Sequence, residues 1–433
     1  MRQSSFFSQA LTTLGVQQFG IVITLAIGVI TARFLGAEGK GYMAMLAAPV
    51  ALITAFGEFG VRQSVAYLIG KKTYTQLEIQ SNILGIFFLT GGIALFAAVI
   101  AYYSLGLLIE TPALALAYAV VAPMILLRRY AGGILLGKQQ IGRINSVDFI
   151  DRATVFSVML VGFLLFGGQL PIAVSATVAG ATVSTVSVLL FIRKSGAMRP
   201  RWNLEIAVLI IKRGVTYAAS LFFITSTSKI GVLLTGTFGT TADAGLYSVG
   251  AGVSELVRQL PLSVGLVLLA RSISWKDETA SEKLDDVSAL TRVMFPLALG
   301  FGLLLTLLAI FLVPLVYGFE FSEAYIVTAV QAPAEAALAG VLLLHFFASG
   351  QGKPSLATVP FAAALGVTLL VGTSLIPSIG HIGASIAVDL GYLVGTVIYL
   401  AVFSRKFSVS IRQLILPRPS DLTFLWSKIR SKG

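Results

Sequence analysis

The feature that most constrains this chain is the length of its uncharged apolar stretches. Between Arg152 and Arg193 the sequence runs for 40 residues without Asp, Glu, Lys or Arg. A transmembrane helix takes about 20 mostly apolar residues, so this stretch is long enough for two bilayer crossings. Of all 433 residues only 12% are charged and 56% are hydrophobic, whereas soluble domains carry about 25% charged residues. The pattern excludes a soluble enzyme and also a disordered chain.

Blocks of about 20 apolar residues predict an all-α polytopic membrane protein with twelve transmembrane helices. The predicted spans are 11–34, 42–70, 79–104, 112–136, 146–167, 171–192, 214–237, 244–270, 293–317, 323–350, 354–376 and 381–403. Gly167, Gly168 and Pro171 supply the turn that divides the long uncharged stretch into two spans.

Lys and Arg fall almost entirely on one side of this predicted topology. With a cytoplasmic N-terminus, the outward loops hold only Lys40, with Arg33 at their edge, and the other loop cations lie in the inward loops and the C-terminal tail. Because cytoplasmic loops are enriched in Lys and Arg, we expect both termini in the cytoplasm. The outward loops carry acids instead, namely Glu38, Glu110, Asp243, Glu320 and Glu323.

The longest basic inward segments suggest how the chain is divided. Residues 193–213 separate two sets of six spans, which predicts an N-terminal lobe over 1–192, a cytoplasmic linker over 193–213 and a C-terminal lobe over 214–403. Residues 404–433 form a basic cytoplasmic tail that either lies on the anionic inner leaflet or only fixes the topology.

Short matches between the two halves indicate a parallel repeat. Val61-Arg62-Gln63 in span 2 matches Val257-Arg258-Gln259 in span 8, at an offset of 196 residues. Gly137-Lys138-Gln139 after span 4 matches Gly350–Lys353 after span 10, at an offset of 213, and the loops after spans 1 and 7 also resemble each other. Two halves of six spans enter the membrane in the same direction, as a parallel repeat requires.

Motifs for soluble cofactors and catalysis are missing. The two Gly-Lys pairs, in 36–41 and 350–354, are not followed by the Ser or Thr that a nucleotide-binding loop needs to hold magnesium. The chain has no cysteine, and its two histidines, His345 and His381, are far apart in sequence. We therefore predict no catalytic residue, no metal site and no cofactor. The net charge is +12, and most charged residues lie between the apolar blocks. This placement favours a membrane partner over nucleic acid.

Twelve ionisable residues inside the predicted spans are the candidate functional residues, because a charge in hydrocarbon costs at least ~2.5–3.5 kcal/mol. The cations are Arg62, Arg128, Arg129, Arg152, Lys229 and Arg258, and the acids are Glu58, Asp148, Asp151, Glu255, Glu335 and Asp389. Helical spacing predicts three pairs, each along one helix: Glu58 with Arg62, Asp148 with Arg152, and Glu255 with Arg258.

The remaining cations have no acid on their own helix. Arg128 and Arg129 share span 4, and Lys229 stands alone in span 7. Each needs either a carboxylate from another helix, such as Glu335 or Asp389 for Lys229, or an anionic ligand. Glu335, about 18 Å along span 10, is a candidate for proton or ion coupling or for an interhelix ion pair.

Several short motifs resemble those of bacterial polysaccharide repeat-unit flippases, the O-antigen or Wzx-type family of the multidrug, oligosaccharidyl-lipid and polysaccharide exporter superfamily. They are Ala32-Arg33-Phe34-Leu35-Gly36, Ala244–Ser248, Tyr317-Gly318 with Glu323-Ala324-Tyr325, and Gly380–Ser385. The resemblance runs in order along nearly the whole chain. One departure is Gly231, which follows Lys229-Ile230 where many members carry an acid.

The resemblance implies two six-helix lobes around a central cavity, which move an undecaprenyl-pyrophosphate-linked oligosaccharide from the cytoplasmic to the periplasmic leaflet of a bacterial inner membrane. The cations Arg33, Arg62, Arg128, Arg129, Lys229 and Arg258 would receive the pyrophosphate and sugars. The acids Glu58, Glu255, Glu335 and Asp389 would serve coupling or ion pairing.

The resemblance implies no cofactor, and it leaves coupling to membrane potential, H⁺ or Na⁺ open. Its implied partners are the lipid-linked glycan and the bilayer, with a polysaccharide polymerase and a chain-length regulator as further candidates. A drug or cation antiporter of the same superfamily and a non-transporting membrane subunit of a polysaccharide synthase are the alternatives. Lipid II flippases are a second relative, although they usually have two additional spans.

Overall fold

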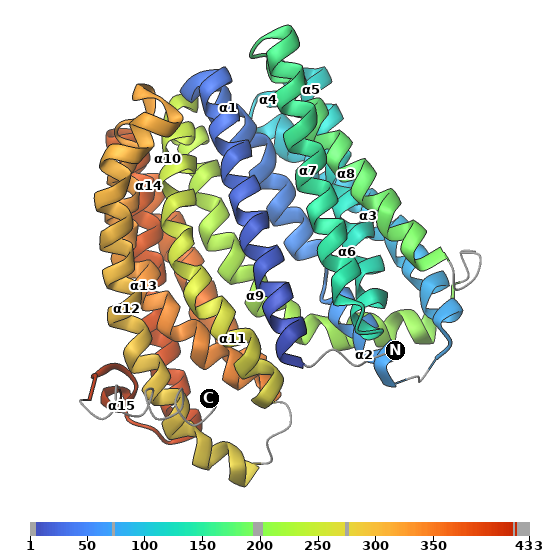
Figure 1. The fold of residues 1–433 in the computed structure, drawn as a ribbon, viewed down its shortest axis with the longest axis vertical. Helices are drawn as coiled ribbons and strands as arrows, with labels where there is room; N and C mark the ends of the chain where they lie inside the picture. Colours follow the sequence, from blue (N-terminus) through green and yellow to red (C-terminus); the bar gives the residue numbers. More distant parts are fainter. Residues whose placement is uncertain (1–5, 72–73, 194–201, 273–276, 419–420, 422–433) are drawn as a thin grey trace. The chain divides into compact units, whose positions relative to one another are not determined.

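The computed structural model describes residues 6–71, 74–193, 202–272, 277–418 and 421, as helices and short connections (Figure 1). These residues contain no β-strand. They form two compact units, one ending at Phe222 and the other beginning at Phe223, here called unit 1 and unit 2.

Unit 1 is built from eight helices and the first part of a ninth in the described ranges. They are α1 (Phe6–Gly57), α2 (Val61–Lys71), α3 (Gln76–Ser104), α4 (Leu107–Glu110), α5 (Pro112–Ala119), α6 (Val121–Gly137), α7 (Ile141–Phe166), α8 (Leu170–Arg193) and the start of α9 (Leu204–Phe238).

Unit 2 holds the rest of α9 and the helices that follow it. They are α10 (Thr241–Ser254), the 3₁₀ turn η1 (Glu255–Arg258), α11 (Gln259–Ser272), α12 (Asp277–Tyr317), η2 (Phe319–Phe321), α13 (Ala324–Gly350), η3 (Pro354–Ala357), α14 (Thr358–Phe407) and α15 (Ile411–Ile415).

The number of membrane crossings agrees with the sequence. Ten helical stretches in the described residues are long and apolar enough to cross a membrane. Two of them, in α1 and α14, are long enough for two crossings each, and both bend at non-helical residues: Gly36 in α1, and Ile379 and Gly380 in α14. Both bends lie where the sequence predicts an outward loop, so the described chain contains the twelve expected crossings of an all-α polytopic membrane protein.

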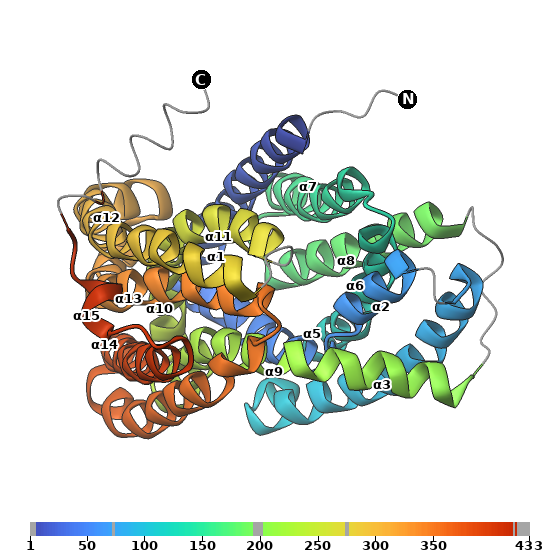
Figure 2. The same cartoon turned by 90° about the horizontal axis from the view of Figure 1, so that it is seen from below.

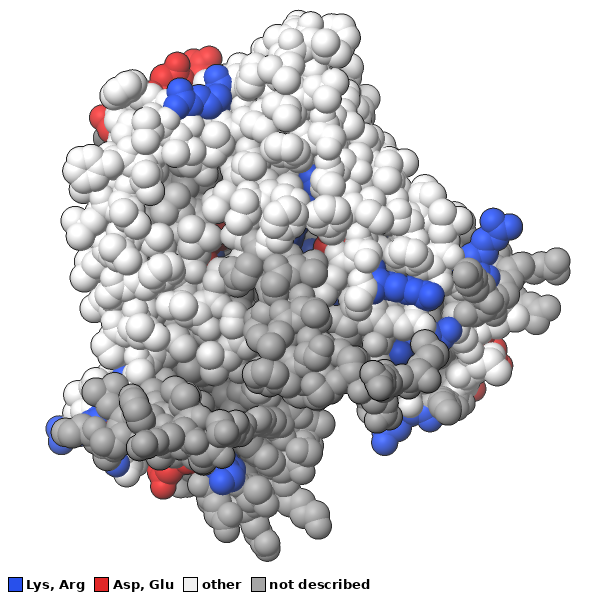
Figure 3. Space-filling model, viewed as in Figure 1, with Lys and Arg blue, Asp and Glu red and all other residues white. Residues whose placement is uncertain are grey.

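The side chains match a membrane environment. Large apolar residues such as Phe88, Phe311 and Leu370 are exposed, as lipid-facing residues are expected to be. In the space-filling view the flanks of the helices are almost wholly white, and most blue and red atoms gather near the helix ends (Figure 3).

Helix α13 is the central helix of unit 2. It packs against α10, α11, α12 and α14, and the end-on view shows it between α12 and α14 (Figure 2). Eighteen of its 27 residues are buried, among them Gln331, Glu335 and His345. Polar residues of α13 are therefore removed from lipid and water and need partners within unit 2.

One end of unit 2 gathers the acids that the sequence assigns to outward loops. His381 Nδ1 lies 2.7 Å from Asp243 Oδ1, and His381 Nε2 lies 3.9 Å from Glu323 Oε2. We call this the acidic end, and we call the opposite end, with Lys353, Arg405 and Arg412, the basic end. The grouping agrees with the predicted loops, and the cytoplasmic position of the basic end stays a prediction.

Two predicted boundary segments take specific structures. Residues 204–213 of the predicted linker begin α9, residues 194–201 lie outside the described residues, and the compact units meet inside α9. In the predicted tail, Asp421 Oδ1 lies 2.5 Å from Arg292 Nη2 of α12, and the Gln413 carbonyl accepts a hydrogen bond from Arg292. Gln413 and Asp421 of the tail therefore dock on α12, while residues 419–420 and 422–433 lie outside the described part; the lobe limits stay predictions.

Candidate functional site

The second crossing of each unit is interrupted next to charged residues. In unit 1, α1 ends at Gly57 and α2 begins at Val61, and the intervening Phe59 and Gly60 have φ of 42° and 64°. In unit 2, α10 passes through the 3₁₀ turn η1 before α11 begins. These are the two crossings that share the Val-Arg-Gln match. Interruptions at corresponding positions of two halves mark the binding region in many repeat-built membrane proteins.

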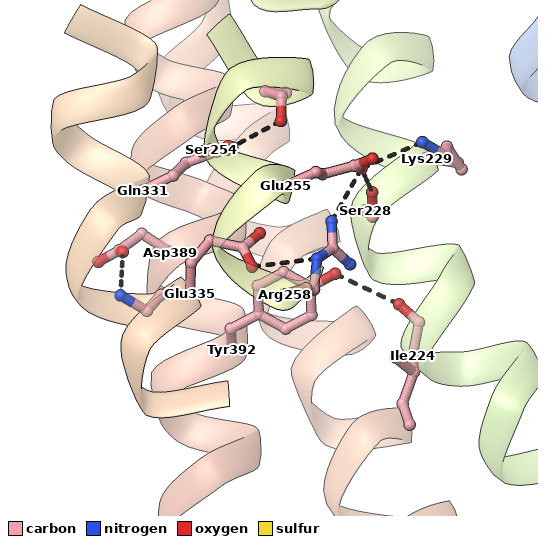
Figure 4. A network of polar contacts seen from close by, with 12 residues as sticks. Ile224, Ser228, Lys229, Ser254, Glu255, Arg258, Gln331, Glu335, Asp389 and Tyr392 are labelled. Atoms are coloured by element: carbon pink, nitrogen blue, oxygen red, sulfur yellow. Dashed lines mark hydrogen bonds and ion pairs between the residues drawn. The ribbon is translucent and has the colours of Figure 1, made fainter. Parts of the chain in front are cut away.

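Four charged residues form a chain of ion pairs at the interruption in unit 2 (Figure 4). Glu255 Oε1 lies 3.1 Å from Lys229 Nζ and 2.9 Å from Arg258 Nη2, and it also accepts a hydrogen bond from the Ser228 hydroxyl. Arg258 Nε lies 3.0 Å from Glu335 Oε2. The side chains come from α9, η1 and α13, so the network joins three segments of unit 2.

Along this network the sign of the charge alternates, and the exposed fraction of the side chains falls from one residue to the next. Two cations and two acids alternate as Lys229, Glu255, Arg258 and Glu335, so their charges sum to zero. The exposed side-chain fractions are 36%, 31%, 14% and 3% in that order. An incoming ligand could therefore reach Lys229 and Glu255, whereas Glu335 depends on Arg258 for its counter-charge.

Neighbouring groups hold the network in place. The guanidinium of Arg258 lies 6.0 Å from the ring centroid of Tyr392, whose hydroxyl donates to the Ile224 carbonyl at 3.3 Å. Gln331 donates to the Tyr247 hydroxyl at 3.1 Å and accepts from Ser254 at 2.7 Å. These contacts tie α9, α10, α13 and α14 together around Arg258.

Asp389 stands beside the network without a cation of its own. Its Oδ1 accepts the Ala334 backbone N–H at 3.1 Å, directly after Pro333, which interrupts the regular hydrogen bonding of α13. Within the described residues Asp389 forms no ion pair. With Asp389 ionised the cluster carries a charge of −1, and with Asp389 protonated the charge is zero.

Unit 1 contains two separate ion pairs built on adjacent arginines of α6. Arg128 Nη1 lies 2.9 Å from Asp151 of α7 and donates to Ser184 of α8 at 2.9 Å. Arg129 Nη1 lies 2.7 Å from Glu58 at the interruption after α1. Adjacent residues point about 100° apart on a helix, so the two guanidinium groups reach different neighbours.

Two of the three predicted intrahelical pairs are wrong. Glu58 and Arg62 lie on opposite sides of the interruption, so they are not on one helix, and Glu58 pairs with Arg129 instead. Asp148 and Arg152 form no ion pair within the described residues, and the Arg152 guanidinium lies against Gly20 of α1. The third predicted pair, Glu255 with Arg258, is confirmed.

The cations that have no acid on their own helix all receive a carboxylate from elsewhere. Arg128 pairs with Asp151, Arg129 with Glu58 and Lys229 with Glu255. The suggested partners of Lys229, Glu335 and Asp389, are wrong, and Glu335 pairs with Arg258 across helices.

Arg62 and Arg33 take no part in the ion pairs described above. Arg62 has no ion pair in the described part of the chain, and its buried Nε makes no hydrogen bond there. Arg33 is exposed, three residues before the bend at Gly36.

The sequence analysis did not single out Ser184, Ser228 or Tyr392 as site residues. Ser228 ends a polar run, Thr225-Ser226-Thr227-Ser228, directly before Lys229, and this run was the available signal. Serine and tyrosine are common in membrane helices, so polarity alone does not identify which hydroxyl bonds a charge.

This arrangement, twelve crossings in two units with interrupted helices and paired charges at membrane depth, has the fold of known membrane transporters. A multidrug resistance MATE family transporter of the MOP superfamily, in an inward-facing conformation, superposes over 92% of this chain and 98% of its own with a TM-score of 0.68 at 14% identity. The lipid II flippase MurJ, in an inward closed conformation, matches over 93% and 89% with 0.62 at 14%. The Vibrio cholerae MATE transporter VcmN matches over 94% and 98% with 0.57 at 14%.

At these identities the likeness establishes the fold, and the family follows from the sequence. Residues 30–326 match the family described as "Polysaccharide biosynthesis protein". The match covers more than half of the chain, and the protein belongs to this family. No curated protein matches the chain.

Proposed function

We propose that the protein is a flippase that moves an undecaprenyl-pyrophosphate-linked oligosaccharide repeat unit from the cytoplasmic to the periplasmic leaflet. It would do so by alternating access, for the assembly of O-antigen, capsule or exopolysaccharide. The observation that carries the proposal is the family match, which places a chain with a transporter fold in polysaccharide biosynthesis. The basic end of unit 2 and both termini would face the cytoplasm of an inner membrane.

The paired cations support a way of receiving a pyrophosphate. Arg129 and Lys229 each expose 36% of the side chain while paired with a carboxylate. A phosphate oxygen offers the same charge-assisted hydrogen bonds as a carboxylate oxygen. The substrate would therefore exchange with Glu58 or Glu255 instead of meeting an unpaired cation. Such an exchange keeps each cation compensated before and after the substrate leaves.

The charge of the substrate gives the transport a direction. A lipid pyrophosphate diester carries about two negative charges, and outward movement from a negative cell interior is favoured by ~4–5 kcal/mol at 100 mV. Because the charges of the four-residue network sum to zero, the network adds no net charge that would offset the charge of the substrate. In proteoliposomes at constant pH, potentials imposed with valinomycin should change the flipping rate. An unchanged rate would indicate that protein charges move with the substrate.

Deletion of the gene tests the substrate class. We expect the lipid-linked oligosaccharide to accumulate in the cytoplasmic leaflet and surface polysaccharide to be lost. The wild-type gene should restore export, Lys229→Gln should restore it poorly, and Arg405→Gln, which alters an exposed cation at the basic end, serves as the matched control. Normal polysaccharide together with increased drug sensitivity would favour the antiporter alternative and refute the flippase.

A further inference from the structure

The interface between α13 and α14 holds a row of polar side chains that begins beside the ion-pair network and continues beyond it. On α14, Asp389, Tyr392, Thr396 and Tyr399 follow one another at spacings of three and four residues, so they share one face. That face meets α13, since the Tyr399 ring lies 6.3 Å from the ring of His345 on α13, centroid to centroid. We call this row, together with His345 and Ser349, the polar seam.

Three polar atoms of the seam are buried without a partner. His345 Nδ1, Thr396 Oγ1 and Tyr399 Oη make no hydrogen bond with the described residues. Their residues are only 5%, 5% and 0% exposed. Buried polar groups are nearly always hydrogen-bonded, and ordered water supplies the partner when the protein does not. Three such atoms along one interface indicate bound water.

The spacing of the seam suits a chain of hydroxyl groups and water. Along α14 the steps from Asp389 to Tyr392, Thr396 and Tyr399 are about 4.5, 6 and 4.5 Å at 1.5 Å per residue. One water molecule with two hydrogen bonds of about 2.8 Å reaches about 5.6 Å, which is similar to these rises along the helix axis.

The hydroxyls of α14 also bridge an apolar interval on α13. The face of α13 that carries Glu335 continues with Leu338 and Leu342 before it reaches His345. Beyond His345, Ser349 Oγ lies 3.5 Å from His345 Nε2 and is partly exposed toward the basic end. The seam therefore leads from the ion-pair network to the end of unit 2 that carries Lys353.

We infer that the polar seam is a water-bearing proton path that joins Asp389 to the basic end of unit 2. A proton leaves the Asp389 carboxyl by breaking its O–H bond and forms a new O–H bond on the adjacent water. Each hydroxyl, and the imidazole of His345 with one nitrogen accepting and the other donating, takes one proton and passes one on; Tyr392 must first turn its O–H away from the Ile224 carbonyl. The net change is one proton moved, and the cluster beside Asp389 alternates between charges of zero and −1.

The charged groups around Asp389 are compatible with this role. Asp389 Oδ1 accepts the backbone N–H of Ala334 on α13; the next residue, Glu335, is paired with Arg258 of η1, and Glu255 is shared between Arg258 and Lys229 of α9. These four charges cancel, so the net charge of the cluster depends on whether Asp389 is protonated. The inference concerns coupling and does not depend on the substrate proposed above.

Exchange of the Asp389 proton can be measured without any substrate. The full chain is reconstituted in lipid, and infrared spectroscopy follows the carbonyl band of protonated carboxyl groups after a change from H₂O to D₂O. The Asp389 contribution is the part that Asp389→Asn removes. We expect its exchange to be about tenfold or more slower in Tyr399→Phe and in Thr396→Val, because each variant keeps the shape of the side chain and removes the hydroxyl.

Tyr42→Phe is the matched control, because Tyr42 of unit 1 also has a buried hydroxyl without a partner among the described residues. It should exchange at the wild-type rate. Exchange at the wild-type rate in both seam variants, or no Asp389-dependent band at any pH, would overturn the path. Equal slowing in Tyr42→Phe would overturn it as well. If the wild-type chain does not support glycan export but exchange is slowed in both seam variants, that result would count against the proposed function and leave the path standing.

Discussion

Removal of Arg258 should destabilise unit 2 far more than removal of Lys229. Arg258 is the cation nearest Glu335, whose side chain is only 3% exposed. A buried acid that loses its partner costs about 3–5 kcal/mol, and we expect a loss of this size in Arg258→Met. Lys229→Met should cost about 0–1 kcal/mol, because Lys229 and Glu255 are both partly exposed and Glu255 keeps Arg258.

A second change separates charge from packing. If the uncompensated carboxylate of Glu335 causes the loss, Glu335→Met in the Arg258→Met background should restore most of the stability, because an apolar pair can replace a buried ion pair. A double-mutant cycle should then give a coupling energy of about 2–3 kcal/mol between the two positions.

Thermal unfolding of the purified protein in detergent measures these differences as shifts of the midpoint. Arg129→Met is a useful control, because its partner Glu58 is 15% exposed and Arg129 itself 36%, so its loss should be intermediate or small. A double variant that is no more stable than Arg258→Met would refute the reasoning, since Glu335 would then be compensated by another group.

Further predictions follow from the two ends of the molecule and from one glycine. Because the chain has no cysteine, a single cysteine at Glu320 should react with an impermeant thiol reagent from outside, and one at Arg412 only after permeabilisation; the reverse would overturn the topology. Hydrogen bonds from its arginine partner in α12 hold the pKa of Asp421 below its usual range, so its contribution to stability is present above about pH 4 and is lost as pH falls further. Asp421→Asn should therefore lower the unfolding midpoint at pH 7, and the difference from wild type should shrink as pH falls below about 4, as scanning calorimetry can check. Gly60→Ala should cost more than about 1–2 kcal/mol, because φ is 64° there and the new Cβ would lie 2.1 Å from a backbone oxygen of α9; Gly92→Ala, with nothing within 4 Å, should be neutral or slightly stabilising in the same unfolding assay.

The helices and their number could be predicted because hydrophobic length sets one crossing per about 20 residues. The same signal does not reveal the interruption at Glu58, Phe59 and Gly60. These three residues lie inside one apolar block, and a short change of backbone direction leaves the hydropathy of the block almost unchanged. The 3₁₀ turn at Glu255–Arg258 was hidden for the same reason.

Site residues could be predicted better than their partners. Ionisable residues inside apolar spans are few and costly, so Lys229, Arg258 and Glu335 stood out from composition alone. Helical spacing identifies contacts along one helix, and it correctly predicted Glu255 with Arg258. The contact of Arg258 with Glu335 joins residues 77 positions apart and depends on how α13 packs, which a single sequence does not contain.

The ion pairs of the two units are related by a reversal of sign. In unit 1 the acid Glu58 lies at the interruption of the second crossing and the base Arg129 on the fourth, whereas in unit 2 the base Arg258 lies at the interruption of the eighth crossing and the acid Glu335 on the tenth. An ion pair survives the exchange of its two charges, so duplicated halves can diverge in this way while the contact between helices is kept. The Val-Arg-Gln match pairs Arg258 with Arg62 and not with Glu58, so a repeat of this kind is better traced by which crossings an ion pair joins than by which amino acids stand at matched positions.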